Sequence, residues 1–112
     1  MLDIKAWLES AGEPAVETCF PPGEAPDLPY LVFLDSVERR GGDLRNLLRR
    51  HSLTVERYSG TNSDNAALEA LFDAQAIKYT KDKQWLGDME CYLTTYDLQT
   101  DLIEREEISN GR

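Results

Sequence analysis

The sequence predicts an α+β fold, in which an antiparallel sheet of four to five strands carries two amphipathic helices packed on one face. Two segments have apolar residues at helical spacing, and five others have the alternating or continuous apolar pattern of strands. Clusters of glycine, proline, asparagine and serine separate these segments. The 112 residues suit one hydrophobic core, so a single domain over residues 1–112 is expected.

The first helix is expected over residues 2–11. Its apolar residues share one helical face: Ile4, Trp7, Leu8 and Ala11. Gly12 is a suitable residue to end the helix, and Pro14 breaks the helical pattern.

Two strands and a loop are expected next. Residues 15–20 alternate loosely and predict a short strand. Residues 21–29 contain four prolines and a glycine, which predicts an extended surface loop. Residues 30–34 form a continuous apolar run typical of a strand buried on both faces, and this strand is expected to continue into the polar residues 35–40.

The middle of the chain predicts a turn, a link and a further strand. Gly41 and Gly42 are turn residues, and residues 44–51 form an arginine-rich link with leucines spaced for one helical turn. Residues 53–58 alternate between apolar and polar side chains, so we expect a strand with one face in water.

The second helix is expected to begin at one of three capping residues, Asn62, Ser63 or Asp64, and to end near Ala76. One face is expected to carry Leu68, Leu71, Phe72 and Gln75.

The C-terminal part predicts a hairpin. Residues 77–86 and 89–102 have strand patterns and flank the turn residues Gly87 and Asp88. Residues 104–112 are charged and are expected to form a frayed tail.

The charge of the chain is strongly acidic overall and uneven along its length. A net charge of −9 argues against a dedicated nucleic-acid binder, because capture of the phosphate backbone relies on lysine and arginine. Residues 1–37 carry one lysine and seven acids, residues 38–57 carry six arginines and three acids, and residues 58–112 carry five basic residues and eleven acids. The middle segment is therefore locally basic.

Candidate catalytic residues are few. His51 is the only histidine, so no imidazole pair exists for a metal, and its expected role is a surface or turn hydrogen bond. Cys19 and Cys91 belong to no CxxC pair and are expected to be buried, unreactive thiols. No glycine-rich phosphate loop is present, and 21 carboxylates make chance acid pairs unavoidable. We therefore expect no cofactor, no metal and no enzymatic activity.

The sequence predicts neither a signal peptide nor a membrane-spanning segment. The N-terminal residues lack the basic start and apolar run of a signal peptide, so folding in a reducing cytosol with free thiols is expected. No stretch approaches the roughly 20 apolar residues that span a bilayer, so no membrane association is expected.

The candidate site is a group of arginines in this acidic chain: Arg39, Arg40, Arg45, Arg49 and Arg50. Guanidinium groups pair with carboxylates through two hydrogen bonds, so the group suits a protein interface. The alternative is a solvated loop whose arginines confer solubility. In a ring of identical subunits, the basic segment would meet the acidic surface of the neighbour in a head-to-tail contact.

Several segments carry a resemblance to a known family. They are Glu-Thr-Cys-Phe at 17–20, Leu-Pro-Tyr-Leu-Val-Phe-Leu-Asp at 28–35, Arg-Gly-Gly-Asp at 40–43 and Leu-Thr-Val-Glu-Arg-Tyr-Ser at 53–59, followed by residues 77–79, Trp85 and residues 89–98. From about residue 15 to residue 102, the chain resembles the tail-completion proteins of long-tailed phages and prophages, which are also called tail-terminator or head-tail joining proteins. The shared features are strands and turns, without a chemical signature.

The resemblance implies a structural virion subunit that is made in the host cytoplasm and works at the head-tail junction. A hexameric ring of such subunits, monomeric or oligomeric before assembly, would cap the tail tube protein and dock on the head connector or stopper protein. DNA would pass an acidic channel without specific binding. The alternatives are another head-tail connector or minor capsid component, and a monomeric adaptor or inhibitor that binds a host protein through residues 21–29 or the arginines.

Overall fold

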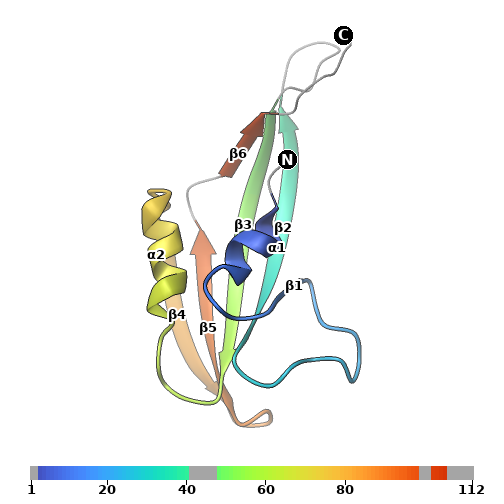
Figure 1. Cartoon of the computed structure of the whole chain (residues 1–112), viewed down its shortest axis with the longest axis vertical. Coiled ribbons are helices and arrows are strands. Elements are labelled where there is room, and N and C mark those ends of the chain that lie inside the picture. The colour runs from blue at the N-terminus through green and yellow to red at the C-terminus, as the bar shows by residue number, and fades with distance from the viewer. Residues whose placement is uncertain (1–2, 41–47, 99–101, 106–112) are drawn as a thin grey trace.

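The computed structural model describes residues 3–40, 48–98 and 102–105, with the backbone alone for residues 37–40, 48–51 and 102–105 (Figure 1). Within these residues the chain forms two helices and one six-stranded sheet, so the α+β class is confirmed. The elements are α1 (Ile4–Glu9), β1 (Ala15–Glu17), β2 (Tyr30–Arg40), β3 (Leu48–Ser59), α2 (Ala66–Ala74), β4 (Tyr79–Leu86), β5 (Cys91–Leu98) and β6 (Leu102–Arg105).

The sheet is mixed, so the expectation of a purely antiparallel sheet is wrong. The strand order is β1-β2-β3-β5-β4, and β6 pairs with the part of β3 that β5 does not reach. All pairs are antiparallel except β1 with β2. The physical reason is the connection over residues 18–29, which is long enough to return the chain to the start of β2, whereas a tight hairpin would have reversed its direction.

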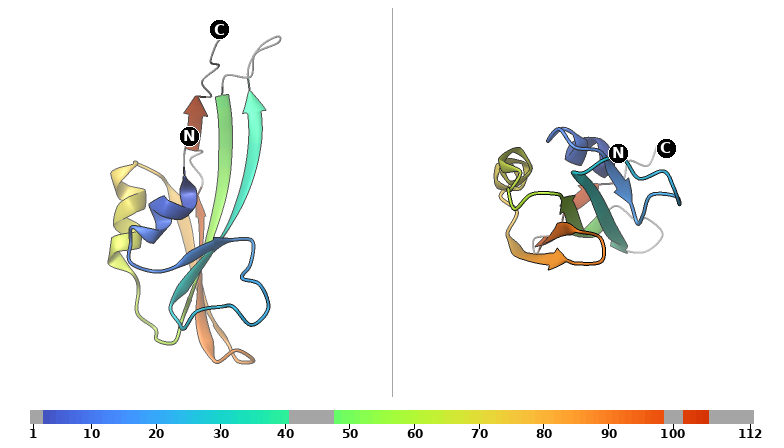
Figure 2. Two further views of the ribbon diagram at one scale, coloured as in Figure 1. Left: turned by 45° about the vertical axis from the view of Figure 1, so that its right-hand side comes forward. Right: turned by 90° about the horizontal axis from the view of Figure 1, so that it is seen from below.

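Both helices lie on the same face of the sheet, as expected (Figure 2). Between them and the strands lies one core of buried side chains: Ile4, Leu8, Ala15, Leu31, Phe33, Leu53, Val55, Leu68, Phe72, Ile77, Tyr96 and Leu98. Phe72 is central, because its ring centroid lies 5.9 Å from Trp7, 5.3 Å from Tyr79 and 5.4 Å from Tyr96. Edge-to-face and tilted ring contacts at these distances are favourable beyond the area that they bury.

The helices begin where side chains cap them. The Asp3 carboxylate accepts a hydrogen bond from the Ala6 amide at 3.0 Å, and the Asn65 side-chain carbonyl accepts one from the Leu68 amide at 3.0 Å. The prediction of Asn62, Ser63 or Asp64 as the second cap is therefore wrong by a few residues. Gln75, predicted on the apolar face, is exposed just after the helix.

The other strands differ from the prediction mainly at their ends. β3 begins at Leu48, so residues 48–51 belong to a strand and not to the predicted link, while the predicted turn and link over residues 41–47 lie outside the described part of the chain. The predicted strand over residues 89–102 is instead two strands, β5 and β6. Residues 104 and 105 lie in β6 and not in a frayed tail, while residues 106–112 lie outside the described part of the chain.

The face of the sheet opposite the helices, called here the back face, has a smaller apolar layer. Val32, Cys91 and Leu93 are buried there, outside the main core. Phe20 meets Tyr30 edge-on at 5.2 Å, and Tyr30 stacks on Tyr58 at 5.2 Å. The sheet is thus buried on both faces at this end, because the segment after β1 covers an otherwise open apolar surface.

Candidate protein interface

Part of the sheet projects beyond the helices. Figure 1 shows that the outer halves of β2 and β3, together with β6, continue past α1 and α2. We call residues 36–40, 48–52 and 102–105 the ribbon. The molecule measures 52 × 31 × 21 Å, and its Cα radius of gyration is 16.0 Å. A compact domain of this length would have a radius of gyration of about 13 Å. The ribbon accounts for the elongated shape.

The ribbon brings most of the predicted arginines together. Arg39 of β2 pairs in register with Arg49 of β3, and Glu38 pairs with Arg50. Arg40 pairs with Leu48, so four of the five arginines lie on paired strands. Arg45, the fifth, lies outside the described residues. Arg39 and Arg40 lie on the strand that was expected to contain them, whereas Arg49 and Arg50, expected in a link, lie instead on β3.

The register places a further charged residue in the same row. Arg49 of β3 has Arg39 of β2 as its register partner on one side and Glu104 of β6 on the other.

A groove lies at the base of the ribbon. Its volume is about 330 Å³, and its lining is formed by Glu17, Thr18, Leu34, Asp35, Ser36, Ser52, Leu53, Thr54 and Asp97. Phe33 and Val55 face the core, so by alternation their neighbours Leu34 and Thr54 face the other way. The groove therefore opens on the back face, whereas Asp35 and Glu17 share the opposite face with their register partners Leu53 and Phe33.

One row of residues crosses the floor of this groove. Leu34 pairs with Thr54, and Thr54 pairs with Asp97 on its other side. The Leu34 residue is 44% exposed, although it ends the most apolar run in the sequence. Sequence reasoning missed this position because a continuous apolar run does not reveal which face of a strand remains open. The only available signal was the change to Asp35 and Ser36 immediately after it.

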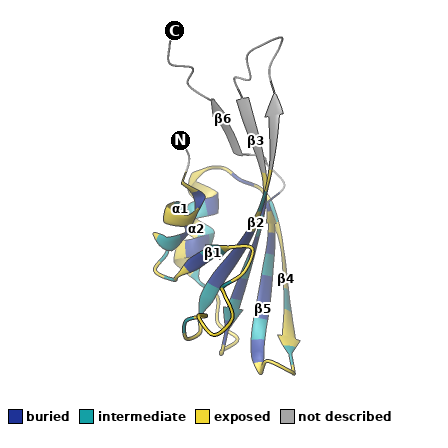
Figure 3. Ribbon diagram, turned by 90° about the vertical axis from the view of Figure 1, so that its right-hand side faces the viewer, coloured by how far each residue is buried: buried dark blue, intermediate teal, exposed yellow. Residues whose placement is uncertain are grey.

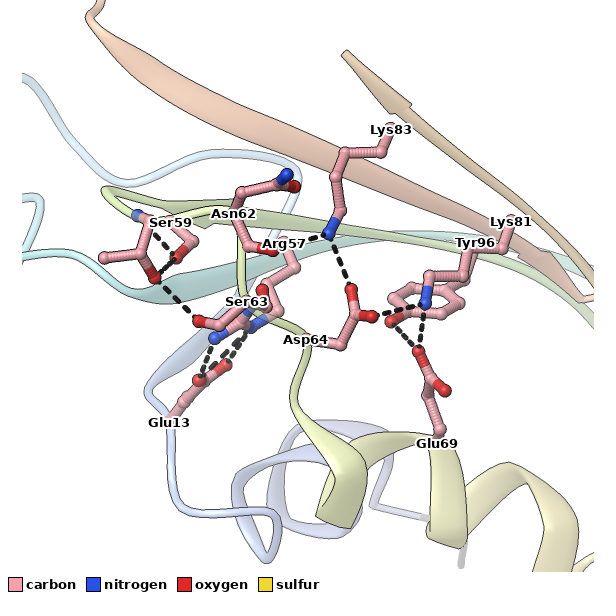
Figure 4. Close-up of polar contacts among 11 residues, drawn as sticks. Glu13, Arg57, Ser59, Asn62, Ser63, Asp64, Glu69, Lys81, Lys83 and Tyr96 are labelled. Carbon is pink, nitrogen blue, oxygen red and sulfur yellow. Dashed lines mark hydrogen bonds and ion pairs between the residues drawn. The ribbon is translucent and has the colours of Figure 1, made fainter. Parts of the chain in front are cut away.

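On the helix face, polar residues form a closed network around the β3–α2 connection (Figure 4). Arg57 is 4% exposed; its Nε and Nη2 atoms donate to the Glu13 carboxylate at 2.9–3.2 Å, and its Nη1 atom donates to the Ser63 carbonyl at 2.8 Å. Glu13 precedes β1, so this ion pair joins the segment after α1 to β3 and to the following loop. The arrangement supplies a buried charge with an opposite charge and with hydrogen-bond acceptors, without which its burial would be costly.

A second group of the network joins α2 to the edge strand β4. The Glu69 carboxylate lies 2.7 Å from Lys81 Nζ and accepts a hydrogen bond from the Tyr96 hydroxyl at 2.6 Å, while Asp64 pairs with Lys81 at 3.1 Å and Lys83 at 2.7 Å. Burial disfavours the ionised form of Glu69, but the hydrogen bonds from Lys81 and Tyr96 outweigh it and lower the pKa of Glu69 below its ordinary value. Burial and the hydrogen bond to Glu69 raise the pKa of Tyr96.

The remaining candidates are placed as follows. His51 lies in β3 opposite Val37, and its side chain lies outside the described part. Cys91 is buried as predicted. Cys19 is exposed, so the expectation of a buried thiol is wrong there, because Cys19 lies in the connecting loop after the short β1.

Among the described residues, no three histidines, cysteines or carboxylates are placed to hold a metal ion. Within the same residues, no helix is long and apolar enough to cross a membrane.

Comparisons with family models, with curated protein sequences and with solved structures found no match to this chain.

Proposed function

We propose that the chain is a structural subunit of a long-tailed phage or prophage, which completes the tail by capping the tail tube as a ring at the head-tail junction. In this role it has no catalytic site. Its contacts are with sister subunits, the tail tube protein and the head connector. The particle, not the free subunit, is its working state.

The observation that carries this proposal is the ribbon. Three strands extend past both helices and have no second layer within the described chain (Figure 1). Where the helices cover the sheet, by contrast, the strands carry buried residues (Figure 3). Narrow sheets need an apolar face packed against another layer to be stable by themselves. A neighbouring subunit would supply that layer, and a closed ring would supply it to every ribbon.

The charge distribution supports the same role. The described body around the helices is rich in carboxylates, whereas β2 and β3 carry four arginines within the ribbon. Opposite charges at two ends of one subunit favour head-to-tail association and give it direction. Around a ring, the excess of carboxylates would keep passing DNA from adhering, because like charges repel.

The test is deletion of the gene from the encoding phage, followed by electron microscopy of the particles. We expect tails of abnormal length that are not joined to heads, and a density for the chain at the junction of wild-type particles. Tails of normal length that fail to join would assign a head-closure role instead of a tail-capping role. Normal, infectious particles that contain no copy of the chain would overturn the proposal.

A second candidate function is that of an adaptor that binds one host protein. The specific observation is the exposure of three large apolar residues away from the ribbon: Leu28 at 39%, and Trp85 and Met89 at 54% each. Trp85 and Met89 lie at the β4–β5 turn, at the opposite end of the sheet from the ribbon (Figure 1). Trp85→Ser with Met89→Ser would abolish adaptor function while leaving ring formation intact, so the two functions are separable.

A further inference from the structure

We infer that subunits join through the backbone edges of the ribbon, with the outer edge of β2 in one copy paired to the outer edge of β6 in the next. The inference rests on the proposed function, because it names the contact by which identical subunits form the ring. The occupant of each edge is a second copy of this chain. The contact is made by main-chain hydrogen bonds between two parallel strands.

Each side of the ribbon ends in a strand that, within the described part of the chain, pairs with β3 alone. β1 pairs with β2 only over residues 31–33, and its last contact is the hydrogen bond of 2.9 Å from the Thr18 amide to the Phe33 carbonyl. β6 pairs with β3. Figure 1 shows β2 and β6 on the two sides of β3 where the sheet passes the helices. An open strand edge of this kind is a template for another strand.

The contacts of β1 show which backbone groups point outward from β2. The Leu31 amide donates to the Pro14 carbonyl at 2.8 Å, and the Phe33 carbonyl accepts from the segment after β1, so both residues turn their backbone groups away from β3. These directions alternate along a strand, and the register of β2 with β3 continues without a break to residue 40. Val37 and Arg39 therefore turn their N–H and C=O groups outward as well.

The register carries this pattern across the ribbon to β6. Arg39 turns its backbone groups away from β3, so its register partner Arg49 turns its own groups away from β2 and toward β6. Arg49 pairs with Glu104, whose backbone groups therefore point inward, while those of Ile103 and Arg105 point outward. Both edges of the ribbon thus offer amides and carbonyls at the same two-residue spacing.

Strand direction identifies the partner of each edge. β2 and β6 are both antiparallel to β3, so they run parallel to each other. A sister copy rotated about an axis along the strands keeps this direction and brings its β6 beside β2. The Ile103 amide can then donate to the Val37 carbonyl while the Ile103 carbonyl accepts from the Arg39 amide, which is the bonding pattern of parallel strands. Repeated from copy to copy, this head-to-tail contact uses both edges and closes into a ring.

A cysteine cross-link in the full chain tests the contact. The variant carries Glu38→Cys and Ile103→Cys, together with Cys19→Ser to remove an exposed natural thiol. Within one subunit, Arg50 of β3 separates the two positions, which puts them about 10 Å apart and too far for a disulfide. Across the inferred contact they lie opposite each other at about 5 Å. Oxidation, in concentrated solution and on purified tail tubes, should give a ladder of linked subunits in a denaturing gel.

The single-cysteine variants are the controls for this cross-link. Glu38→Cys alone and Ile103→Cys alone, each with Cys19→Ser, should give no linked species, because the head-to-tail contact joins unlike edges. Dimers from Glu38→Cys alone would show a two-fold pairing of β2 with β2, which leaves β6 unused and stops at two subunits. That result would overturn the inference.

Two matched pairs of substitutions separate backbone pairing from side-chain contact. Ile103→Pro and Arg39→Pro each remove an outward amide that β3 does not use, a position at which edge strands tolerate proline. Each should weaken self-association about tenfold or more, because a carbonyl of the neighbour loses its donor. Ile103→Val and Arg39→Thr keep the amide and should assemble as the wild type does. Sedimentation velocity over a concentration series measures the association, and circular dichroism confirms that each variant is folded.

The outcomes separate this inference from the proposed function. If the two cysteines do not link, or if each proline variant assembles as well as its control, the edges do not pair and the inference fails, while a ring built through another surface would still appear at the head-tail junction in electron micrographs. If Arg39→Thr weakens association as much as Arg39→Pro, the side chain makes the contact and the inference also fails. Linked ladders in solution, from a chain that is absent from the particles, would support the edge pairing and overturn the proposed function.

Discussion

The body and the ribbon are built from the same two long strands but are stabilised in different ways. In the body, β2 and β3 have Leu31, Phe33, Leu53 and Val55 packed under two helices, and each of these is at most 4% exposed. In the ribbon, the same strands carry one glutamate and four arginines and extend past the helices. The change occurs within three residues of Leu34 on β2.

The difference separates folding from assembly along one strand pair. The body has an apolar layer, capped helices and a satisfied polar network, so it is expected to supply nearly all of the folding free energy. The ribbon contributes backbone hydrogen bonds and charge. Substitutions in the body should therefore change stability, whereas substitutions in the ribbon should change association.

The largest expected effect is at the centre of the body. Phe72→Ala removes a fully buried ring that touches three other rings, and it should lower the free energy of unfolding by about 4 kcal/mol, because a cavity remains where the side chain cannot be replaced. Urea denaturation followed by circular dichroism measures it. Trp85→Ala is the matched control: Trp85 is 54% exposed, and the loss there should stay below about 1.5 kcal/mol. Equal losses would contradict the position of the core.

The second effect concerns the buried ion pair. Arg57→Met should lower the free energy of unfolding by about 3 kcal/mol, because it leaves the Glu13 carboxylate without its cation at a site where the two side chains are only 5% and 11% exposed. The double variant Glu13→Gln, Arg57→Met should recover part of this loss. Lys5→Met is the control, since Lys5 and Glu9 form an exposed helical pair and its loss should cost about 0.5 kcal/mol or less. A loss at Arg57 no larger than that at Lys5 would show that the pair contributes little.

Local patterns predicted most of the body. The helical spacing of Ile4, Trp7 and Leu8 and the predicted capping residues 62–64 located both helices to within a few residues. The turn residues Gly87 and Asp88 likewise predicted the hairpin between β4 and β5. These predictions succeeded because each depends on residues close together in sequence.

Features set by distant residues were not predictable. The parallel pairing of β1 depends on where residues 18–29 lead the chain, and the Glu13–Arg57 pair joins residues 44 apart. The groove could not be predicted for the same reason, because its lining residues Glu17, Leu34 and Asp97 come together only in the folded sheet. The arginine group was identified from composition, but its place on two paired strands depended on a register that the sequence pattern did not contain.

A smaller effect should distinguish the polar network of the body from simple packing. Glu69 has a pKa below its ordinary value of 4.5, so in the folded state it resists protonation more than in the unfolded state. Its contribution is fully present above 4.5 and is lost as the pH falls through the lower folded value. Glu69→Gln should lower the free energy of unfolding at neutral pH by about 1 kcal/mol. The free energy of unfolding of this variant should also decline less steeply than that of the wild type as the pH falls below 4.5. An unchanged pH dependence of the urea midpoint would exclude this role, and Lys81→Met should flatten the curve in the same way.

The smallest effect on folding is expected where the body passes into the ribbon. Leu34→Thr keeps a β-favouring residue at a site that is 44% exposed, so the free energy of unfolding should change by about 0.5 kcal/mol or less. Leu31→Thr, three residues earlier and fully buried, should cost more than about 2 kcal/mol because it places a hydroxyl in the core. Chemical denaturation of both variants measures the contrast, and equal costs would mean that Leu34 serves the fold. If Leu34→Thr spares the fold but weakens self-association, the exposed leucine acts between subunits, since a side chain that contributes little to its own core can gain burial only from a partner.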